Sequence, residues 1–317
     1  MAGYHGAMEI GSVLFGAGQG KRLRPLTEAL PKPALPMLDV PLAAWGLAGL
    51  ARVAPPVVVN VSHLASRLID ALGGLGIPGW EPLIESPRAY GTAGTLAALR
   101  DRVGGRVLTW NGDLLTELDP VDLLRTHERL ARPATVAVVR VPAGADLGIN
   151  REIVTRFVDR RRRPDVAGVR FIGAGVFERD ALDRLPATRP AGLGETLLRD
   201  LGESGDLGVH VFGGYWSDVG TPKAYRRASL DLLYGRAPAA PVAPPGEVIE
   251  VQGGLAYVGP DVSVERRALG AGAIVLRGAR VGAGTSIRDS IVMPDETVSP
   301  GRQIVNSIWF QAHPVLG

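Results

Sequence analysis

A six-residue repeat near the C-terminus constrains the fold more than any other feature of the sequence. An aliphatic residue, often followed by Gly and other small residues, recurs at every sixth position: Leu269, Val275, Val281, Ile287 and Met293. Two further pairs keep this step but are slipped by one residue, Val258 with Val264 and Val298 with Ile304. The pattern is typical of a left-handed parallel β-helix, in which the aliphatic side chains point inward and the small residues form the corners. We therefore expect roughly three coils over residues 258–308, with the Gly- and Val-rich edge of a β-sandwich as the alternative.

Residues 11–141 follow a different pattern, in which short apolar runs alternate with amphipathic stretches. Strands are expected at 11–15, 56–61, 106–110 and 134–141, and helices at 41–52, 63–72, 92–102 and 120–131. Because the strands are apolar on both faces, this alternation predicts an α/β fold with a Rossmann-like, mostly parallel sheet between two layers of helices. Ligands bind such sheets at the carboxyl ends of the strands, so the loops after Phe15 and Trp110 should carry the chemistry.

A stretch rich in Pro and Ala, residues 236–247, separates the two patterns. This composition is typical of a semi-rigid linker. The 317 residues are enough for two domains with cores of their own. We therefore expect an α/β domain over residues 1–235 and a β-helix domain over residues 248–317.

Composition excludes several classes of protein. The chain has no cysteine, which rules out disulfide scaffolds, thiolate metal sites and cysteine nucleophiles. The formal net charge is +3 and the densest basic run is Arg160–Arg163, so nucleic acid is not an expected partner. Every apolar run is well short of the roughly 18 residues of a membrane helix, and residues 1–12 lack a signal-peptide pattern. We therefore expect no membrane partner and a cytoplasmic location.

The loop after the first predicted strand combines three glycines, at 16, 18 and 20, with a dense set of cations. Glycines let a backbone approach a phosphate and direct N–H groups toward it. The cations that follow are Lys21, Arg22, Arg24 and Lys32. A Walker motif is excluded, because Phe15 stands where its first glycine would be and neither Ser nor Thr follows Lys21. A dinucleotide fingerprint would need a third glycine at position 21. The set suits a triphosphate and its pyrophosphate leaving group.

Two aspartates follow predicted strands. Asp113 ends Trp-Asn-Gly-Asp, directly after the strand at 106–110, and Asp218 lies in Tyr-Trp-Ser-Asp at 215–218. A carboxylate at the end of a buried strand is well placed to bind Mg²⁺. The two lie 105 positions apart in the sequence, so their proximity is a prediction about the fold.

These segments together resemble one family, the sugar-nucleotide pyrophosphorylases, which are nucleotidyltransferases acting on sugar 1-phosphates. The family signature Gly-x-Gly-x-Arg-Leu-x-Pro-Leu-Thr matches residues 18–27, and Pro-Lys-Pro-x-x-Pro matches residues 31–36. The resemblance implies that a nucleoside triphosphate and a sugar 1-phosphate give a nucleotide-sugar and pyrophosphate. With its short β-helix the chain looks most like mannose-1-phosphate guanylyltransferases, which implies GTP and mannose 1-phosphate. The alternatives are UTP, an ADP-forming reaction, or a heptose or N-acetylmuramic acid phosphate.

The resemblance also implies roles for individual residues. Arg22 and Lys32 would be catalytic, and Asp113 and Asp218 would bind Mg²⁺. The implied nucleotide-binding residues are Ala17, Gly18, Gly20, Lys21, Glu85, Gly91, Thr92 and Gly112. The implied residues for the sugar phosphate are Gly173, Glu195 and Arg163. Arg163 is included as a replacement for a lysine. Relatives carry Glu-Lys-Pro before the segment of Gly173, and its lysine meets the sugar phosphate, whereas this chain has Asp159, Arg160–Arg163 and Pro164.

Two other functions fit parts of the sequence. A non-catalytic sensor of nucleotide-sugars would explain the missing Glu-Lys-Pro, but it need not keep both aspartates. An acyltransferase would fit the hexapeptide repeat, but the histidine that such enzymes use is absent from the hexads, and after position 210 only His313 remains. The family resemblance also implies assembly into a homo-oligomer through the β-helix.

Overall fold

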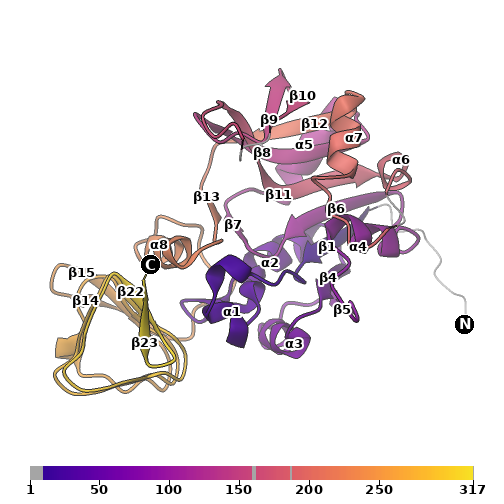
Figure 1. Cartoon of the computed structure of the whole chain (residues 1–317). Coiled ribbons are helices and arrows are strands. Elements are labelled where there is room, and N and C mark those ends of the chain that lie inside the picture. The colour runs from indigo at the N-terminus through magenta and orange to yellow at the C-terminus, as the bar shows by residue number, and fades with distance from the viewer. Residues whose placement is uncertain (1–9, 159–161, 186–187, 317) are drawn as a thin grey trace, which may run out of the picture.

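The computed structural model describes residues 10–158, 162–185 and 188–316. A layered α/β body is followed by coils of short strands with a triangular outline (Figure 1). This arrangement confirms the predicted fold class. In the described ranges the helices are all too short or too polar to span a bilayer.

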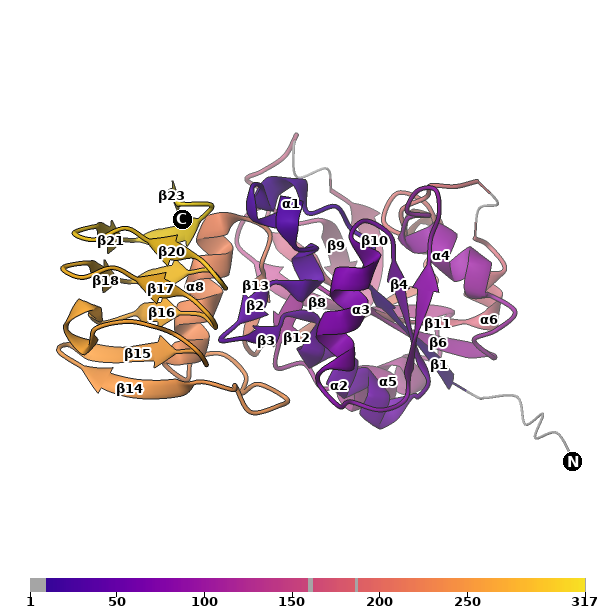
Figure 2. The same cartoon turned by 90° about the horizontal axis from the view of Figure 1, so that it is seen from below.

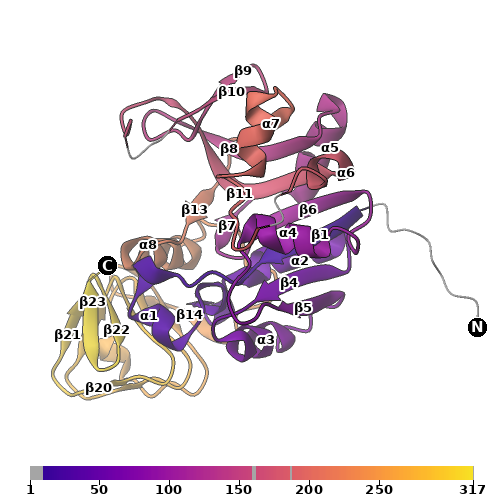
Figure 3. The ribbon, with the colours of Figure 1, turned by 45° about the vertical axis from the view of Figure 1, so that its right-hand side comes forward.

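A nine-stranded sheet forms the centre of the α/β body, in the order β5-β4-β1-β6-β11-β8-β12-β10-β9. The strands are β1 Ile10–Phe15, β4 Val57–Val61, β5 Trp80–Ile84, β6 Arg106–Asn111, β8 Ala134–Val141, β9 Leu147–Asn150, β10 Ile153–Phe157, β11 Gly168–Glu178 and β12 Leu207–Phe212. Figure 3 shows β5, β4, β1, β6, β11 and β8 stacked in this order, with β5 below and with β9 and β10 at the top. The first four strands are mutually parallel, and β8 is parallel to β12. Strand β11 runs against both β6 and β8, and β10 runs against both β12 and β9, so two reversed strands interrupt the parallel order.

Helices cover both faces of the sheet because its strands are apolar on both sides. One layer contains α2 Ala43–Val53, α3 Ala65–Gly73 and α5 Pro120–Leu130, and the other contains α4 Thr92–Leu99, α6 Arg179–Leu182 and α7 Leu197–Glu203. Neighbouring side chains of β1 point to opposite faces of the sheet. Val13 packs in the core of α4, α6 and α7, whereas Leu14 packs in the core of α2, α3 and α5.

Short elements link the sheet to the coils. They are the 3₁₀ turns Lys21–Leu23 and Lys32–Ala34, α1 Leu26–Ala29, β2 Pro36–Met37, β3 Val40–Pro41, β7 Leu114–Thr116, β13 Trp216–Asp218 and α8 Pro222–Leu233. Residues 236–246, which follow α8, contain neither helix nor strand. They still contact the α/β body, since Trp45 Nε1 donates a hydrogen bond to the carbonyl of Pro238 at 3.2 Å.

The C-terminal strands stack as parallel coils. They are β14 Glu247–Val251, β15 Gly254–Val258, β16 Ala273–Val275, β17 Arg280–Val281, β18 Ser286–Arg288, β19 Ser290–Val292, β20 Thr297–Val298, β21 Gln303–Val305, β22 Ser307–Phe310 and β23 His313–Leu316, with a 3₁₀ turn at Arg266–Ala268. On one face, β15, β16, β19 and β22 pair in parallel. The antiparallel strands β14 and β23 close the two ends of this face.

The coils correct one sequence prediction, the inward position of Met293. Strand pairing repeats every 17 residues, as Val275 pairs with Val292 and Val281 with Val298. A coil with three six-residue sides would need 18 residues, so one side of each coil here has five residues. Val292 therefore takes the inward position, and Met293 turns outward to pack against α8. The same shortening explains the slipped register of Val298 and Ile304, which lie in the coil interior as expected.

Helix α8 joins the coils to the α/β body, and Figure 2 shows it lying between them. One apolar cluster includes residues of the loop after β1, of α8 and of the outer face of the coils. Tyr225 of α8 is fully buried in this cluster. Its hydroxyl donates a hydrogen bond to the carbonyl of Pro36 at 2.5 Å and contacts Met293 Sδ at 3.8 Å. The two parts of the chain thus share a core.

Candidate active site

A cleft of about 340 Å³ opens at the carboxyl ends of β1 and β6, where the sequence predicted the chemistry. Its walls come from the glycine loop, the Pro-Lys-Pro segment and the end of β6. The polar or charged residues among them are Lys21, Arg22, Lys32, Thr92, Asn111 and Asp113. Gly18 and Gly20 also line it.

The glycine loop offers a row of backbone donors to this cleft. The N–H groups of residues 17–22 make no hydrogen bond to another residue in the described part of the chain. Gly20 has φ +60°, and a Cβ there would lie 2.8 Å from Thr27 Cγ2. The bend at Gly20 is held by Thr27, whose hydroxyl donates to the Gly20 carbonyl at 3.0 Å. Successive unpaired N–H groups of this kind form a concavity that binds anions.

Lys32 holds the two predicted aspartates together. Its Nζ lies 2.5 Å from Asp113 Oδ2 and 3.3 Å from Asp218 Oδ1. The lysine side chain is 8% exposed, whereas the aspartates are 33% and 49% exposed. The two aspartates lie close together because β7 and β13 pair in the antiparallel direction. This pairing places Asp218 opposite Leu114, the neighbour of Asp113. Residues 105 positions apart therefore share one ammonium group.

The donor set fits a divalent cation such as Mg²⁺. Mg²⁺ is usually bound by one or two carboxylates, with water and substrate phosphate oxygens as its other ligands. Groups of three or more acidic or histidine ligands are absent from the described residues, so a purely protein-made metal cage is not what this cleft offers. A cation held by Asp113 and Asp218 would have its remaining ligand positions open to water and phosphate oxygens.

Arg22 lies at the mouth of the cleft. Its Nη2 is 3.8 Å from Asp218 Oδ2, and its side chain is largely exposed. A Cβ at Gly220 would lie 3.0 Å from both Arg22 Nη2 and Asp218 Oδ1, so the glycine leaves space for this pair. The guanidinium retains most of its donors for a ligand.

Glu85 has a different place from the one expected. It is 2% exposed, and both carboxylate oxygens accept hydrogen bonds from the protein. The donors are the Tyr90 N–H, the Thr95 hydroxyl and Asn60 Nδ2, at 2.5–2.9 Å. A direct contact between Glu85 and a nucleotide does not fit this burial. The carboxylate instead ties the end of β4 to the start of α4.

Gly91 and Gly112 are needed for backbone packing. Gly91 has φ +75°, and a Cβ there would lie 2.4 Å from the Ala191 carbonyl oxygen. A Cβ at Gly112 would lie 2.9 Å from the Phe15 carbonyl, which accepts a hydrogen bond from the Gly112 N–H. Thr92 lines the cleft, and its hydroxyl accepts a hydrogen bond from the Leu193 N–H. Ala17, at 6% exposed, contributes backbone only.

A second cleft of about 730 Å³ shares Arg22, Asn111 and Asp113 with the first. Gly173 lies in its wall, at a break in the pairing of β11, with φ +100°. A Cβ at Gly173 would lie 2.5 Å from Asn111 Nδ2, so only glycine admits the amide. The shared residues place the two clefts next to each other.

The cations of the second cleft differ from the one expected. Arg163 is exposed and lines neither cleft, and Glu195 is also exposed and lines neither. Arg160 and Arg161 lie outside the described residues. The basic residues that line the second cleft are Arg22, Arg170, Lys223 and Arg227. The sequence motifs contained Asn111 and Lys223 but gave neither a role, and no motif indicated Arg170.

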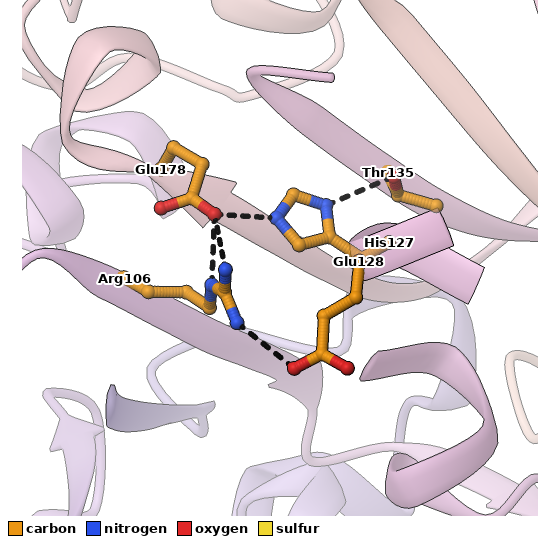
Figure 4. A network of polar contacts seen from close by, with 5 residues as sticks. All are labelled: Arg106, His127, Glu128, Thr135 and Glu178. Atoms are coloured by element: carbon orange, nitrogen blue, oxygen red, sulfur yellow. Dashed lines mark hydrogen bonds and ion pairs between the residues drawn. The ribbon is translucent and has the colours of Figure 1, made fainter. Parts of the chain in front are cut away.

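A second polar network lies at the opposite end of the strands (Figure 4). Buried His127 contacts Glu178 Oε1 at 2.9 Å and the Thr135 hydroxyl at 3.0 Å, and Arg106 donates to the same Glu178 oxygen at 2.8 Å. Burial lowers the pKa of His127, against the opposite effect of Glu178. Burial favours a higher pKa for Glu178, but the hydrogen bonds from Arg106 and His127 outweigh it and lower the pKa. Because the glycine loop and the two aspartates lie at the other end of the strands, we assign this network a structural role.

Comparison with known proteins agrees with this geometry. The family model described as "Nucleotidyl transferase" matches residues 11–234. A mannose-1-phosphate guanylyltransferase from Mycobacterium tuberculosis is 28% identical over 92% of this chain and 82% of its own length. An N-acetylmuramate alpha-1-phosphate uridylyltransferase from Neisseria meningitidis is 30% identical over 66% of this chain and 93% of its own length. The crystal structure of HddC from Yersinia pseudotuberculosis superposes with a TM-score of 0.58 at 19% identity, over 69% of this chain and 98% of that one, which shows a shared fold.

Proposed function

The chain belongs to the nucleotidyl transferase family, and we propose that it joins GTP to mannose 1-phosphate, giving GDP-mannose and pyrophosphate. The observation that carries this proposal is the Lys32 ammonium between Asp113 and Asp218, next to the row of unpaired N–H groups. Such a set suits two phosphate-bearing substrates that must be brought together against their mutual repulsion.

The reaction needs no side-chain nucleophile. A phosphate oxygen of the sugar 1-phosphate attacks the α-phosphorus of the triphosphate, and the bond from this phosphorus to the oxygen bridging to the β-phosphate breaks. Pyrophosphate leaves with the electron pair. Because the attacking oxygen is already anionic, catalysis comes from positioning and from stabilisation of charge.

Each group at the cleft has a part in this stabilisation. The N–H groups of residues 17–22 would hold the triphosphate, with Gly18 and Gly20 allowing its close approach. Arg22 would stabilise the charge that develops on the pyrophosphate. Lys32 would neutralise phosphate charge near the reacting atoms, and burial strengthens its effect.

Asp113 and Asp218 would hold Mg²⁺, which when bound supplies charge neutralisation between the phosphates of the two substrates. Glu85 would act at a distance, by fixing the loop that carries Tyr90 and Thr92. Gly173 would admit the sugar beside Asn111.

The choice of GTP and mannose 1-phosphate rests on the extent of the likeness. The guanylyltransferase from M. tuberculosis aligns with 92% of this chain, a span that must include most of the coils. The uridylyltransferase from N. meningitidis aligns with 66%. Because the uridylyltransferase has the higher identity, UTP and N-acetylmuramic acid 1-phosphate are the second candidate pair of substrates. Phe171, which lines the second cleft, would supply an apolar wall for such a sugar.

The test is a matrix of nucleoside triphosphates against sugar 1-phosphates with Mg²⁺, in which pyrophosphate release is measured. We expect release with GTP and mannose 1-phosphate. Release confined to another pair would replace the substrates and keep the reaction. No release from any pair, with nucleotide-sugar still bound in calorimetry, would favour the non-catalytic sensor.

We also propose that copies of the chain associate through the coils. Strands β14 and β23 are the edges of the six-stranded face, and they carry Val248 and Leu316, which are 51% and 84% exposed. Unpaired edges with exposed apolar side chains favour pairing with a second chain. Light scattering on the wild type and on the Val248→Lys, Leu316→Lys variant tests this, and an unchanged mass would contradict it.

A further inference from the structure

The three lysines of this chain occupy one region of the structure. The sequence has 35 basic residues, of which 32 are arginine, so lysine has been kept at few positions. Lys21 and Lys32 line the first cleft, and Lys223 lines the second. The two clefts adjoin, which places every lysine of the chain around one continuous site.

Lys223 lies in the first turn of α8, on the cleft side of the helix. The turn is fixed by Thr221, whose hydroxyl accepts a hydrogen bond from the Ala224 N–H at 3.2 Å. Asp218 lies five residues earlier, at the end of β13, and lines the same cleft. Lys223 therefore lines the same cleft as the proposed metal carboxylates Asp113 and Asp218.

Lys223 also differs from its basic neighbours in having no partner. It makes no hydrogen bond or ion pair with any other residue that the structure describes. Arg170 donates to the Gly144 carbonyl from both Nε and Nη2, at 3.2 and 2.8 Å. Arg227 lies 3.9 Å from Asp231. Among the basic residues that line the second cleft but not the first, Lys223 is thus the one without a partner in the described part of the chain.

A lysine suits this position better than an arginine. Four carboxylates line the second cleft, those of Asp113, Asp146, Asp218 and Asp231. A planar guanidinium favours bidentate pairing with a carboxylate, whereas an ammonium is a compact, strongly hydrated charge. An ammonium here can remain unpaired until a phosphate arrives.

We propose that Lys223 binds the phosphate of the sugar 1-phosphate, in place of the cation expected near Arg163. The inference rests on the proposed function and adds to it a residue that recognises the second substrate. It also supplies a cation for this role that lines the cleft, whereas Arg163 lines neither cleft.

The experiment compares Lys223→Ala and Lys223→Arg with the wild type, using GTP and mannose 1-phosphate. Arg125→Ala is the matched control, because it removes one positive charge from another exposed helix, where Arg125 pairs with Asp122. Loss of a charge-assisted contact should raise the KM for mannose 1-phosphate about 10- to 100-fold in Lys223→Ala. The KM for GTP should change less than about threefold, and Lys223→Arg should recover part of the loss, because it keeps the charge but can pair with a neighbouring carboxylate.

A KM for mannose 1-phosphate within about twofold of the wild type in Lys223→Ala would overturn the inference. An equal rise in both KM values in both variants would overturn it as well, since it would indicate a structural role. Calorimetry with mannose 1-phosphate and with free mannose separates this inference from the proposed function. If the wild type makes no pyrophosphate but binds mannose 1-phosphate and loses that binding in Lys223→Ala, the proposed function fails and the inference stands. If the wild type does not bind mannose 1-phosphate at all, both fail.

Discussion

Replacing Lys32 by Met tests the central geometry of the site. The substitution keeps much of the apolar stem and removes the ammonium that lies 2.5 Å from Asp113 and 3.3 Å from Asp218. Two carboxylates that shared a cation then face each other without one. We expect a loss of stability, a loss of activity and an altered response to Mg²⁺.

The size of the stability loss follows from the exposure of the three side chains. Breaking a fully buried ion pair costs about 3–5 kcal/mol, and breaking an exposed one costs about 0.2–1 kcal/mol. Lys32 is buried, but the aspartates are 33% and 49% exposed, so the cost lies between these limits, at about 1–2 kcal/mol. For a chain of this size, that lowers the melting temperature by about 1.5–3 °C. Removal of a preorganised cation should also cost on the order of 100-fold in turnover.

Magnesium should reverse part of the stability loss. In the wild type the ammonium competes with a metal ion for the two carboxylates, whereas in Lys32→Met both are available. A ligand stabilises the folded state in proportion to RT ln(1 + [L]/Kd), so millimolar Mg²⁺ should raise the melting temperature of the variant more than that of the wild type.

Thermal melts with and without MgCl₂ measure this difference. Lys21→Met is the control, because Lys21 is exposed and no partner for it exists among the described residues, so its loss should stay within about 0.5 kcal/mol. A Lys32→Met protein with the melting temperature of the wild type and the same Mg²⁺ response would refute the reasoning.

Three further predictions follow from other contacts. Asp113→Asn and Arg22→Ala should each lower pyrophosphate release by about 100-fold without a change in circular dichroism, and near-normal turnover would remove that residue from the mechanism. Glu85→Gln keeps the shape but loses acceptor capacity for its three buried donors, so calorimetry should show a loss of about 2 kcal/mol; an unchanged melting temperature with weaker nucleotide binding would instead restore Glu85 to the ligand contacts. Because burial holds the pKa of folded His127 below 6.5, the unfolded chain takes up the proton more readily, so stability should fall as the pH drops from about 7.5 to 5.5. This fall should be smaller in His127→Gln, and an equal fall in both proteins would assign the pH dependence elsewhere.

Local patterns were enough to predict most elements of the fold. The apolar runs at 11–15, 56–61, 106–110 and 134–141 are strands, and the Gly-rich loop lies at the carboxyl end of the first. The direction of β11 could not be predicted in the same way. Hydrophobic alternation is the same for a strand that runs up or down, so only its long-range pairing with β6 and β8 sets the direction.

The candidate site shows the same limit. The motifs indicated Lys32, Asp113 and Asp218, because residue types that bind phosphate or metal follow strand ends. Sequence could not distinguish Glu85 as a buried acceptor from a ligand group, since that depends on whether Thr95 and Asn60 reach it. The six-residue step predicts Met293 as an inward residue, whereas the inward residue is Val292, one position earlier. The 17-residue coil that causes this shift is visible only in the pairing of stacked strands.

The core shared by α8 and the coils limits how this architecture can change during evolution. A descendant that lost the coils would leave the face of α8 that contains Tyr225 and Ala228 open to water. Selection would then have to replace these residues with polar ones. In this chain the coils and the α/β body therefore depend on each other for the burial of apolar surface, and a change in the number of coils should add or remove whole 17-residue repeats.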